Sequence, residues 1–415
     1  MHLLSPRRKK LLIVAGAGSA IEFGMPSVSD VHELFLRTAQ QYFPFRNDFK
    51  KNIYGYLYDE IERYWIANNR QDQRRKPNFE DVLYAIYTLV GVYPSGINTS
   101  ALGAFVGMKS FPDTARQDLN DESLLRSLGQ QLIDGLLAEM RGRCIQDPPH
   151  FAELETFFSF LSQKFDLAVI TTNYDDLIHR SLPHLETGFD VGQDSIFDRK
   201  RILDRKSWGC LLHLHGSVHF DMDVSNYAVD DMYWQRDFKK CHPNAYGRAV
   251  NRTSEGNEYP SSCIIAGYGK PVQIQRQPFR TYYSELDRLT DKCDVVLFLG
   301  YGFGDRHLNH AFADYRDARN RPVVVIDYAS DTAFSARGSN EFERTSVRRA
   351  MSIFRNRSGQ MSCNGNDSPP TVGPIKEAKI FEYSTDNGPI SFWYNGMLEA
   401  CRNLPKVMAA LGQSI

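Results

Sequence analysis

The sequence predicts an α/β fold, in which an open parallel sheet is flanked by helices and carries a large helical insertion. Five short apolar segments each stop at a polar or glycine-bearing loop, as buried parallel strands do. Stretches with apolar residues at helical spacing lie between them. Because ligands of such sheets bind beyond the carboxyl ends of the strands, we expect a site in these loops. The predicted strands are residues 11–15, 167–171, 211–214, 295–299 and 323–326.

Helical patterns fill the region after the first strand. A helix is predicted at 27–39, and we interpret residues from about 41 to 160 as a helical insertion. Within it, Asn78 and Asp81 have the spacing of a capping box that opens a helix. Further helices are predicted at 79–90, 123–140 and 151–165.

Two long segments of different composition follow. Residues from about 217 to 286 are rich in aromatics and turn-forming pairs, and we interpret them as an insertion that covers the site. Residues 329–374 are polar, which favours a loop or partial disorder. A strand at 379–383 and a helix at 392–411 are predicted to complete the chain.

Length and composition indicate a globular protein. The 415 residues suffice for a full core, and we expect one domain over 1–330 with 331–415 as an extension packed on it. The formal net charge of -1 provides no general attraction to nucleic acid, so we expect no direct nucleic-acid binding, although the basic run at 7–10 is a candidate local patch. No apolar stretch reaches the roughly 20 residues that cross a bilayer, so we predict no membrane contact and a cytoplasmic location. The 7 scattered cysteines form no CxxC pair, which indicates neither a zinc ribbon nor a disulfide framework.

The first strand runs into a glycine-bearing loop. Gly16, Ala17, Gly18 and Ser19 lie between this strand and a helix, and Gly24 follows them. Glycine lets a backbone approach a pyrophosphate closely, and a helix N-terminus offers amide donors and a positive dipole. The spacing is not GxGxxG, so the predicted fold is Rossmann-like without the usual dinucleotide fingerprint. A tight packing turn is the alternative interpretation.

The fourth predicted strand ends in a second glycine loop. Gly300, Tyr301 and Gly302 are followed by Asp305 and His307, and all five are candidate cofactor-binding residues. Glycines at alternate positions again allow backbone contact with a phosphate or ribose. Because both loops follow strands of one sheet, we expect them to converge.

Polar side chains end the other strands. Asn173 and Asp175 stand at alternate positions and can both point into a crevice, or else cap a helix. His215 precedes a glycine and is a candidate general base. No third ligand accompanies it and His213, so we predict no metal site and interpret His213 as a hydrogen-bonded structural histidine. Asp327 is placed to accept hydrogen bonds from a ribose diol, or to cap a turn.

Together these motifs resemble those of the sirtuin family. Sirtuins carry GAG, five residues and GIP, then TQNID, an HG pair, a GTS loop and a strand-terminal Asn. The matching positions here are Gly16 to Gly18, Gly24 to Pro26, Thr171 to Asp175, His215 with Gly216, Gly300 to Gly302, and Asp327. The resemblance covers residues 11–40 and 165–330 and keeps the family's order of motifs.

The resemblance implies a role for each of these residues on NAD. Asn173 would hold the nicotinamide ribose and a reacting water, and His215 would be the general base. Asp175 would bind the nicotinamide carboxamide. The glycine loops and Asp327 would hold the diphosphate and the adenosine ribose. Domain 1–330 would then be a sirtuin-like NAD-binding catalytic domain.

The chain also departs from the protein-deacylating sirtuins. It lacks their four-cysteine zinc module, Val28 and Ser29 stand where they have a Phe-Arg pair, and Thr172 replaces their Gln. The stretch 78–80 and the loop 300–307 instead resemble sirtuin-like effectors of bacterial anti-phage systems. The resemblance therefore implies an enzyme that splits NAD into nicotinamide and ADP-ribose, with NAD as its substrate and no zinc. A deacylase or ADP-ribosyltransferase and a non-catalytic NAD or ADP-ribose sensor are the alternatives.

Such an enzyme would be toxic if it were always active, so we expect its activity to be gated. The resemblance implies a homo-oligomer and a HerA-type ATPase as partner. An Argonaute-type partner is the second choice, because the predicted C-terminal tail is short.

Overall fold

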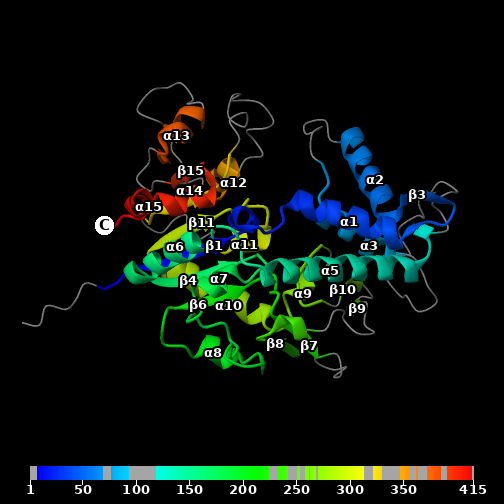
Figure 1. Cartoon of the computed structure of the whole chain (residues 1–415), viewed down its shortest axis with the longest axis horizontal. Helices are drawn as coiled ribbons and strands as arrows, with labels where there is room; N and C mark the ends of the chain where they lie inside the picture. Colours follow the sequence, from blue (N-terminus) through cyan, green and yellow to red (C-terminus); the bar gives the residue numbers. More distant parts are fainter. Residues whose placement is uncertain are drawn as a thin grey trace, which may run out of the picture.

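The computed structural model contains one large sheet that carries the predicted strands (Figure 1). Its strands are β1 (Lys10–Ala15), β4 (Asp166–Thr171), β6 (Cys210–His213), β11 (Val295–Leu299), β12 (Val323–Ile326), β13 (Met361–Ser362), β14 (Glu382–Ser384) and β15 (Ile390–Trp393). They lie in the order β13-β14-β15-β12-β11-β1-β4-β6. All pairs from β15 to β6 are parallel, and β14 and β13 add antiparallel strands at one edge. The predicted Rossmann-like α/β class is confirmed.

The structure describes most of the chain. The described residues are 7–68, 76–92, 118–223, 231–241, 250–252, 258–260, 262–267, 270–312, 321–329, 346–354, 361–362, 372–384 and 390–413.

The order of the strands creates a reversal point at the centre of the sheet. After β1 the chain adds β4 and β6 on one side, and later adds β11, β12 and β15 on the other. Ligands of open α/β sheets bind outside the carboxyl ends of the strands at such a point. The central strands β1 and β11 are buried along almost their whole length, as strands covered on both faces require. The loops after β1 and β11 are therefore where a ligand is expected.

Helices flank the sheet. Helix α6 (Phe151–Lys164) packs against β4, and α14 (Gly396–Arg402) packs against β12 and against α6. Helix α10 (Phe279–Lys292) packs against β1 and β6. Its buried apolar residues recur at helical spacing and are Phe279, Tyr282, Leu286 and Leu289.

The predicted helical block lies to one side of the sheet, at the right in Figure 1. It contains α1 (Val28–Tyr42), the hairpin of β2 (Pro44–Phe45) and β3 (Asp48–Asn52), α2 (Ile53–Asn68), α3 (Phe79–Val92) and α5 (Glu122–Ile145). The long helix α5 packs against both α1 and α3. The predicted capping box is confirmed, since Asp81 N donates to Asn78 Oδ1 at 3.0 Å and Asn78 N donates to Asp81 Oδ2 at 2.9 Å.

Shorter elements complete the described chain. A three-stranded sheet joins β5 (Ser195–Ile196), β7 (Phe220–Asp223) and β8 (Asp231–Trp234), and a hairpin joins β9 (Val250–Arg252) and β10 (Glu258–Pro260). The short helices are η1 (Ala17–Ser19), η2 (Ile21–Phe23), α7 (Leu177–Ser181), α8 (Arg199–Leu203), η4 (Phe238–Lys240), α9 (Lys270–Gln273), α11 (Arg306–His310), α12 (Ser346–Ile353), α13 (Val372–Ala378) and α15 (Leu404–Ala410). Of the helices in the described ranges, none has both the length and the apolar content that crossing a bilayer demands.

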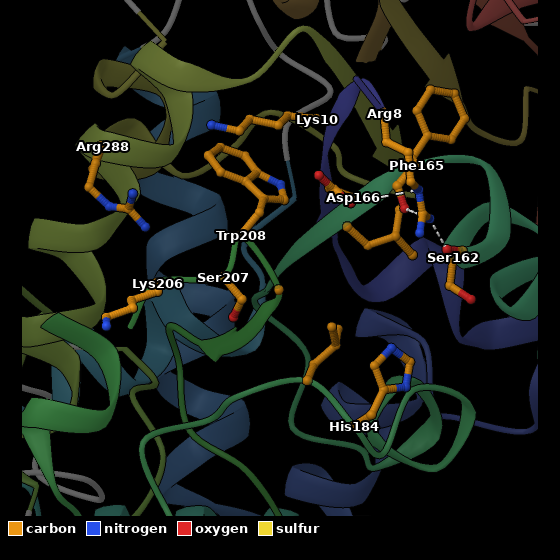
Figure 2. Close-up of a pocket in the computed structure, with 13 residues that line it drawn as sticks. Arg8, Lys10, Ser162, Phe165, Asp166, His184, Lys206, Ser207, Trp208 and Arg288 are labelled. Atoms are coloured by element: carbon orange, nitrogen blue, oxygen red, sulfur yellow. Dashed lines mark hydrogen bonds and ion pairs between the residues drawn. The ribbon is translucent and has the colours of Figure 1, made fainter. Parts of the chain in front are cut away.

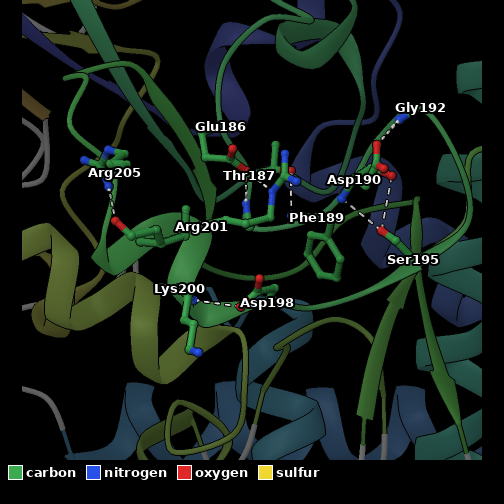
Figure 3. A network of polar contacts seen from close by, with 12 residues as sticks. Glu186, Thr187, Phe189, Asp190, Gly192, Ser195, Asp198, Lys200, Arg201 and Arg205 are labelled. Carbon is green, nitrogen blue, oxygen red and sulfur yellow. Dashed lines mark hydrogen bonds and ion pairs between the residues drawn. The ribbon is translucent and has the colours of Figure 1, made fainter.

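A polar network ties the loop before β6 to that strand (Figure 3). The Glu186 carboxylate accepts hydrogen bonds from Gly188 N at 2.9 Å and from Arg201 Nε at 3.0 Å. Its main-chain oxygen accepts from Leu211 N at 2.9 Å, so the loop runs beside β6. This arrangement fixes the strand that leads into His215.

The C-terminal region differs from the prediction. The predicted helix at 392–411 is wrong in its first part, because Ile390–Trp393 form the buried strand β15, and the rest is divided into α14 and α15 at Asn403. A short apolar run fits a strand as well as a helix, so periodicity alone could not decide. The predicted strand at 379–383 is confirmed only at its end, because β14 covers Glu382–Ser384 and residues 379–381 lie outside any strand. The polar stretch 329–374 lies mostly outside the described residues, although α12 within it is helical.

The amino ends of the strands border a separate cavity of about 570 Å³ (Figure 2). Arg8 lines it and donates to the carbonyl oxygens of Ser162 and Phe165 at the end of α6. Its Nε also lies 3.6 Å from Asp166 Oδ1. Arg8, from the basic run at 7–10, thus satisfies helix-terminal carbonyls, which a cation does well.

Candidate functional site

The two predicted glycine loops meet at the reversal point of the sheet. Gly16 N donates to Leu299 O at 2.9 Å, and Gly18 N donates to Gly300 O at 3.0 Å. A Cβ atom on Gly16 would lie 2.8 Å from Gly300 O, and one on Gly18 would lie 2.9 Å from it. Glycine is therefore required for this close approach of two backbones.

The backbone conformation of Gly300 leads us to expect that substitution by alanine destabilises the fold. Its φ of 53° is in the left-handed region, and a Cβ there would overlap the backbone of Gly18 and Ser19. Gly300→Ala is expected to lower the free energy of unfolding by about 1–3 kcal/mol from backbone strain alone. Urea denaturation measures this loss. Gly302→Ala is the matched control, since nothing lies within 4 Å of its Cβ position, and equal losses in both variants would contradict the argument.

A cavity of about 1130 Å³ opens beside these loops, beyond the carboxyl ends of β1, β4, β6 and β11. Pockets for drug-sized ligands measure roughly 300–1,000 Å³, so this one has room for a longer molecule such as a dinucleotide. The lining brings together these residues proposed from the sequence: Gly16, Ala17, Gly18, Asn173, Asp175, His215, Gly300, Tyr301, Gly302 and Asp305.

The remaining proposed residues lie outside this lining. Ser19 stands directly behind it and contacts Asn173. Gly24 ends η2 with a φ of 88°. His307 is exposed on α11. The Asp327 carboxylate accepts from the next backbone N–H, that of Tyr328, at 2.8 Å, in the manner of the turn cap considered above.

Asn173 lies at the carboxyl end of β4. Thr171 is paired with His213 across the sheet, so Asn173 and His215 occupy equivalent places beyond neighbouring strands. Asn173 Nδ2 donates to Ser19 Oγ at 3.3 Å. Asn173 Oδ1 is buried and has no hydrogen-bond partner among the described residues. A buried unpaired amide oxygen is costly, so this oxygen indicates a hydrogen bond that a ligand would supply.

Asp175 combines a structural contact with a position in the cavity. Its Oδ1 accepts from Leu177 N at 3.1 Å at the start of α7, as the capping alternative predicted. The side chain also lines the cavity. Burial, together with the nearby charge of Asp176, raises the pKa of Asp175 to about 7. Near neutral pH this carboxyl group can therefore either donate or accept a hydrogen bond.

His215 is held by its own loop and meets the second glycine loop. Gly216 has a φ of 100°, Ile265 N donates to His215 O at 2.8 Å, and Gly216 forms a β-bridge with Ile264. His215 Nε2 lies 2.9 Å from Asp305 Oδ2, and the two side chains are 8% and 9% exposed. A candidate base after β6 thus contacts a carboxylate that follows β11.

The prediction that His213 is hydrogen-bonded is wrong. The residue is 1% exposed, and neither ring nitrogen has a partner within the described ranges. The ring lies instead among aromatics, 5.8 Å from the Phe220 centroid and 6.3 Å from that of Trp234. Burial lowers the pKa of His213 to about 3. Over the same ranges, no cluster of three or more His, Cys, Asp or Glu side chains is arranged to hold a metal ion.

Sequence reasoning did not assign a charged pair that lines the cavity. Lys270 Nζ lies 2.9 Å and 3.1 Å from the two carboxylate oxygens of Glu80. Arg349 also lines the cavity and donates to Gly302 O at 2.9 Å. The capping box beside Glu80 is a local sequence pattern that could have drawn attention to this residue. Lys270 and Arg349 lie in segments without a recognisable motif, and only the tertiary structure brings them to the cavity.

Part of the chain is similar to a known domain family. Residues 167–349 match the SIR2-like domain family, and no curated protein matches the chain. Similar solved structures include a mutant Sir2 homologue with ADP-ribose, at 13% identity over 84% of this chain and 92% of that one, with a TM-score of 0.34. A Sir2 homologue–NAD complex has 11% identity, 84% and 88% coverage and a TM-score of 0.33. Sir2Tm bound to a propionylated peptide has 13% identity, 98% and 95% coverage and a TM-score of 0.34.

Proposed function

We propose that this protein is an NAD⁺ glycohydrolase, which releases nicotinamide and ADP-ribose. The observation that carries the proposal is the buried, unpaired Asn173 Oδ1 in a cavity between two closely apposed glycine loops. The match of residues 167–349 to the SIR2-like domain supports it, because that segment contains Asn173, His215 and the second glycine loop. The order of the sirtuin-like motifs along the chain supports it further.

The residues in the cavity suit this reaction. The bond between the nicotinamide nitrogen and ribose C1′ breaks, and its electrons neutralise the pyridinium, so the leaving group needs no general acid. A water oxygen forms the new bond to C1′, and the proton that this water loses is taken by His215. Asn173 Oδ1 would accept from the water or a ribose hydroxyl. Asp175, with its pKa raised to about 7, would match the donor and acceptor of the nicotinamide carboxamide.

Incubation of the purified chain with NAD⁺, alone and together with the proposed ATPase partner, tests the proposal. Mass spectrometry is expected to detect nicotinamide and ADP-ribose in equal amounts. Nicotinamide release that depends on an acetylated peptide, with transfer of the acetyl group to ADP-ribose, would favour a deacylase instead. Calorimetric binding of NAD⁺ without any release of nicotinamide would favour a sensor.

The biological role proposed with this activity is NAD⁺ depletion in bacterial anti-phage defence. The support is the resemblance of the stretch 78–80 and of the loop 300–307 to sirtuin-like effectors of such systems. Gating would then come from assembly of the chain with itself or with a HerA-type ATPase. Turnover measured against enzyme concentration, with and without the partner, tests this. Strictly linear activity with no partner requirement would count against gating.

A further inference from the structure

Asp305 is held in one orientation by hydrogen bonds within its own loop and helix. It is the N-cap of α11, where its Oδ1 accepts from His307 N at 2.9 Å and from Leu308 N at 3.2 Å. Its main-chain oxygen accepts from the Tyr301 hydroxyl at 3.2 Å. The other carboxylate oxygen, Oδ2, takes part in neither of the backbone hydrogen bonds that Oδ1 accepts. It lies 2.9 Å from His215 Nε2. The cap therefore aims one carboxylate oxygen at the imidazole ring.

The charge of Asp305 determines which imidazole nitrogen carries a proton. Burial raises the pKa of Asp305, but the contact with His215, the charge of Lys270 and the Leu308 N–H outweigh it, so the pKa lies below its ordinary value. The group is therefore ionised near neutral pH, and an ionised carboxylate can only accept hydrogen bonds. In the neutral ring, the nitrogen that faces this carboxylate, His215 Nε2, is then the protonated one. Nδ1 is left with the free lone pair, on a side chain that lines the cavity.

We propose that Asp305 is a positioning residue, which holds His215 with Nε2 protonated and Nδ1 as its basic atom. The proposal rests on the NAD⁺-splitting function proposed above and adds the regulation of its base. A carboxylate behind an imidazole selects one tautomer, prevents the ring from flipping and stabilises the imidazolium that forms when the ring takes a proton. Asp305 would then act through His215, whereas the sequence suggested direct contact with the cofactor.

Asp305→Asn separates these two roles. Asparagine caps helices about as well as aspartate, so α11 should keep its N-terminus. Its amide can donate to Nε2 as well as accept from it, which admits the wrong tautomer. We expect kcat to fall by about 100- to 10,000-fold with KM nearly unchanged, as losses of an orienting carboxylate or a general base do. A rise in KM with unchanged kcat would instead show direct cofactor binding and overturn the proposal.

Two further variants distinguish the loss of the contact with His215 from the loss of helix capping. Asp305→Ser also supplies a capping oxygen but is too short to reach His215, so it should lose as much kcat as Asp305→Asn. Asp198→Asn is the matched control, because Asp198 caps α8 by accepting from Lys200 N at 2.9 Å and does not line the cavity. It should keep the wild-type kcat. Equal losses in Asp198→Asn and Asp305→Asn would assign the effect to capping alone and overturn the proposal.

Nitrogen NMR of the His215 ring decides the question without any turnover. In the wild-type chain labelled with ¹⁵N-histidine, we expect the Nε2-protonated tautomer; in Asp305→Asn we expect a mixture or the Nδ1-protonated form. The same tautomer in both proteins would overturn the proposal, even if kcat falls. If the wild-type chain released no nicotinamide either alone or with the ATPase partner, the proposed function would fail, and the NMR comparison would still report on Asp305.

Discussion

His215→Ala is expected to lower the rate of nicotinamide release by about 100- to 10,000-fold, the usual contribution of a general base. The side chain lies in the cavity beside Asp305, and among the described residues that line the cavity no second histidine is left to accept the proton of the attacking water. The loop should keep its shape, because Ile265 holds it through the main-chain oxygen of residue 215. Initial rates of nicotinamide formation, measured by mass spectrometry, check the effect.

His310→Ala is the matched control for this loss. His310 is exposed on α11 and lies outside the cavity lining, so its removal should leave the rate unchanged. Circular dichroism during heating should give similar unfolding temperatures for the wild type and both variants. Wild-type turnover in His215→Ala would rule out His215 as the base.

Asn173→Ala should cause a comparable loss of activity by a different route. The substitution removes Oδ1, which is buried and unpaired among the described residues, so little stability is lost with it. Among the described residues, the substitution removes the 3.3 Å hydrogen bond to Ser19 Oγ and the side-chain contact with Asp175. A folded but inactive variant would therefore point to a lost ligand contact. Full activity would remove Asn173 from the mechanism.

Local sequence patterns predicted the central part of this site. The runs that became β1, β4, β6 and β11 are apolar and end abruptly, which identifies buried parallel strands from their residues alone. The positions of Asn173 and His215 follow from this, because each stands two residues past a paired position, Thr171 and His213. Because neighbouring parallel strands are in register, strand pairing alone predicts that these two residues lie near each other.

The partnership of Asp305 with His215 could not be predicted in the same way. Their strands, β11 and β6, are separated in the sheet by β1 and β4, so the contact depends on how far the loop after β11 reaches. Phe303 in that loop has a φ of 52°, a left-handed conformation that no sequence rule assigns to phenylalanine. The loop's course is set by tertiary contacts, such as the 2.8 Å bond from the Tyr301 hydroxyl to Asn309 Oδ1.

The interpretation of His213 failed for a related reason. A histidine in a strand is usually satisfied by a hydrogen bond, but here the space around it is filled by rings from β7 and β8. Those strands belong to the segment interpreted only as a covering insertion. Which rings surround a buried polar group is a property of packing between distant segments.

Three buried histidines, among them His213, are expected to make the stability of the fold depend strongly on pH. His179 and His219 lie with His213 around Trp234, and burial lowers the pKa values of the three histidines to about 4, 4 and 3 respectively. Between the ordinary value of 6.5 and these lowered values, the unfolded chain takes up protons that the folded chain does not. Each histidine therefore contributes stability that is lost as the pH falls from about 6.5 toward 4.

His213→Phe isolates one of these titrations. Phenylalanine keeps an aromatic ring beside Phe220 and Trp234 and removes two buried nitrogens, which should raise the free energy of unfolding by about 1–3 kcal/mol at pH 7. Because the variant has nothing to protonate there, its advantage should grow by about 1.4 kcal/mol for each unit that the pH falls below 6.5. Urea denaturation of both proteins at a series of pH values measures the difference.

The comparison of two proteins is essential, because other groups titrate in the same range with the opposite sign. Burial raises the pKa of Asp134 to about 6, and burial with the charge of Asp176 raises that of Asp175 to about 7, so the folded chain binds protons there that the unfolded chain releases. Their contributions to the free energy of unfolding rise as the pH falls and mask the effect of the histidines in the wild-type pH profile. They cancel when the profile of the wild type is subtracted from that of His213→Phe. A flat difference for His213→Phe would mean that His213 is protonated as readily in the folded chain as in the unfolded one, which its burial among Phe220 and Trp234 argues against.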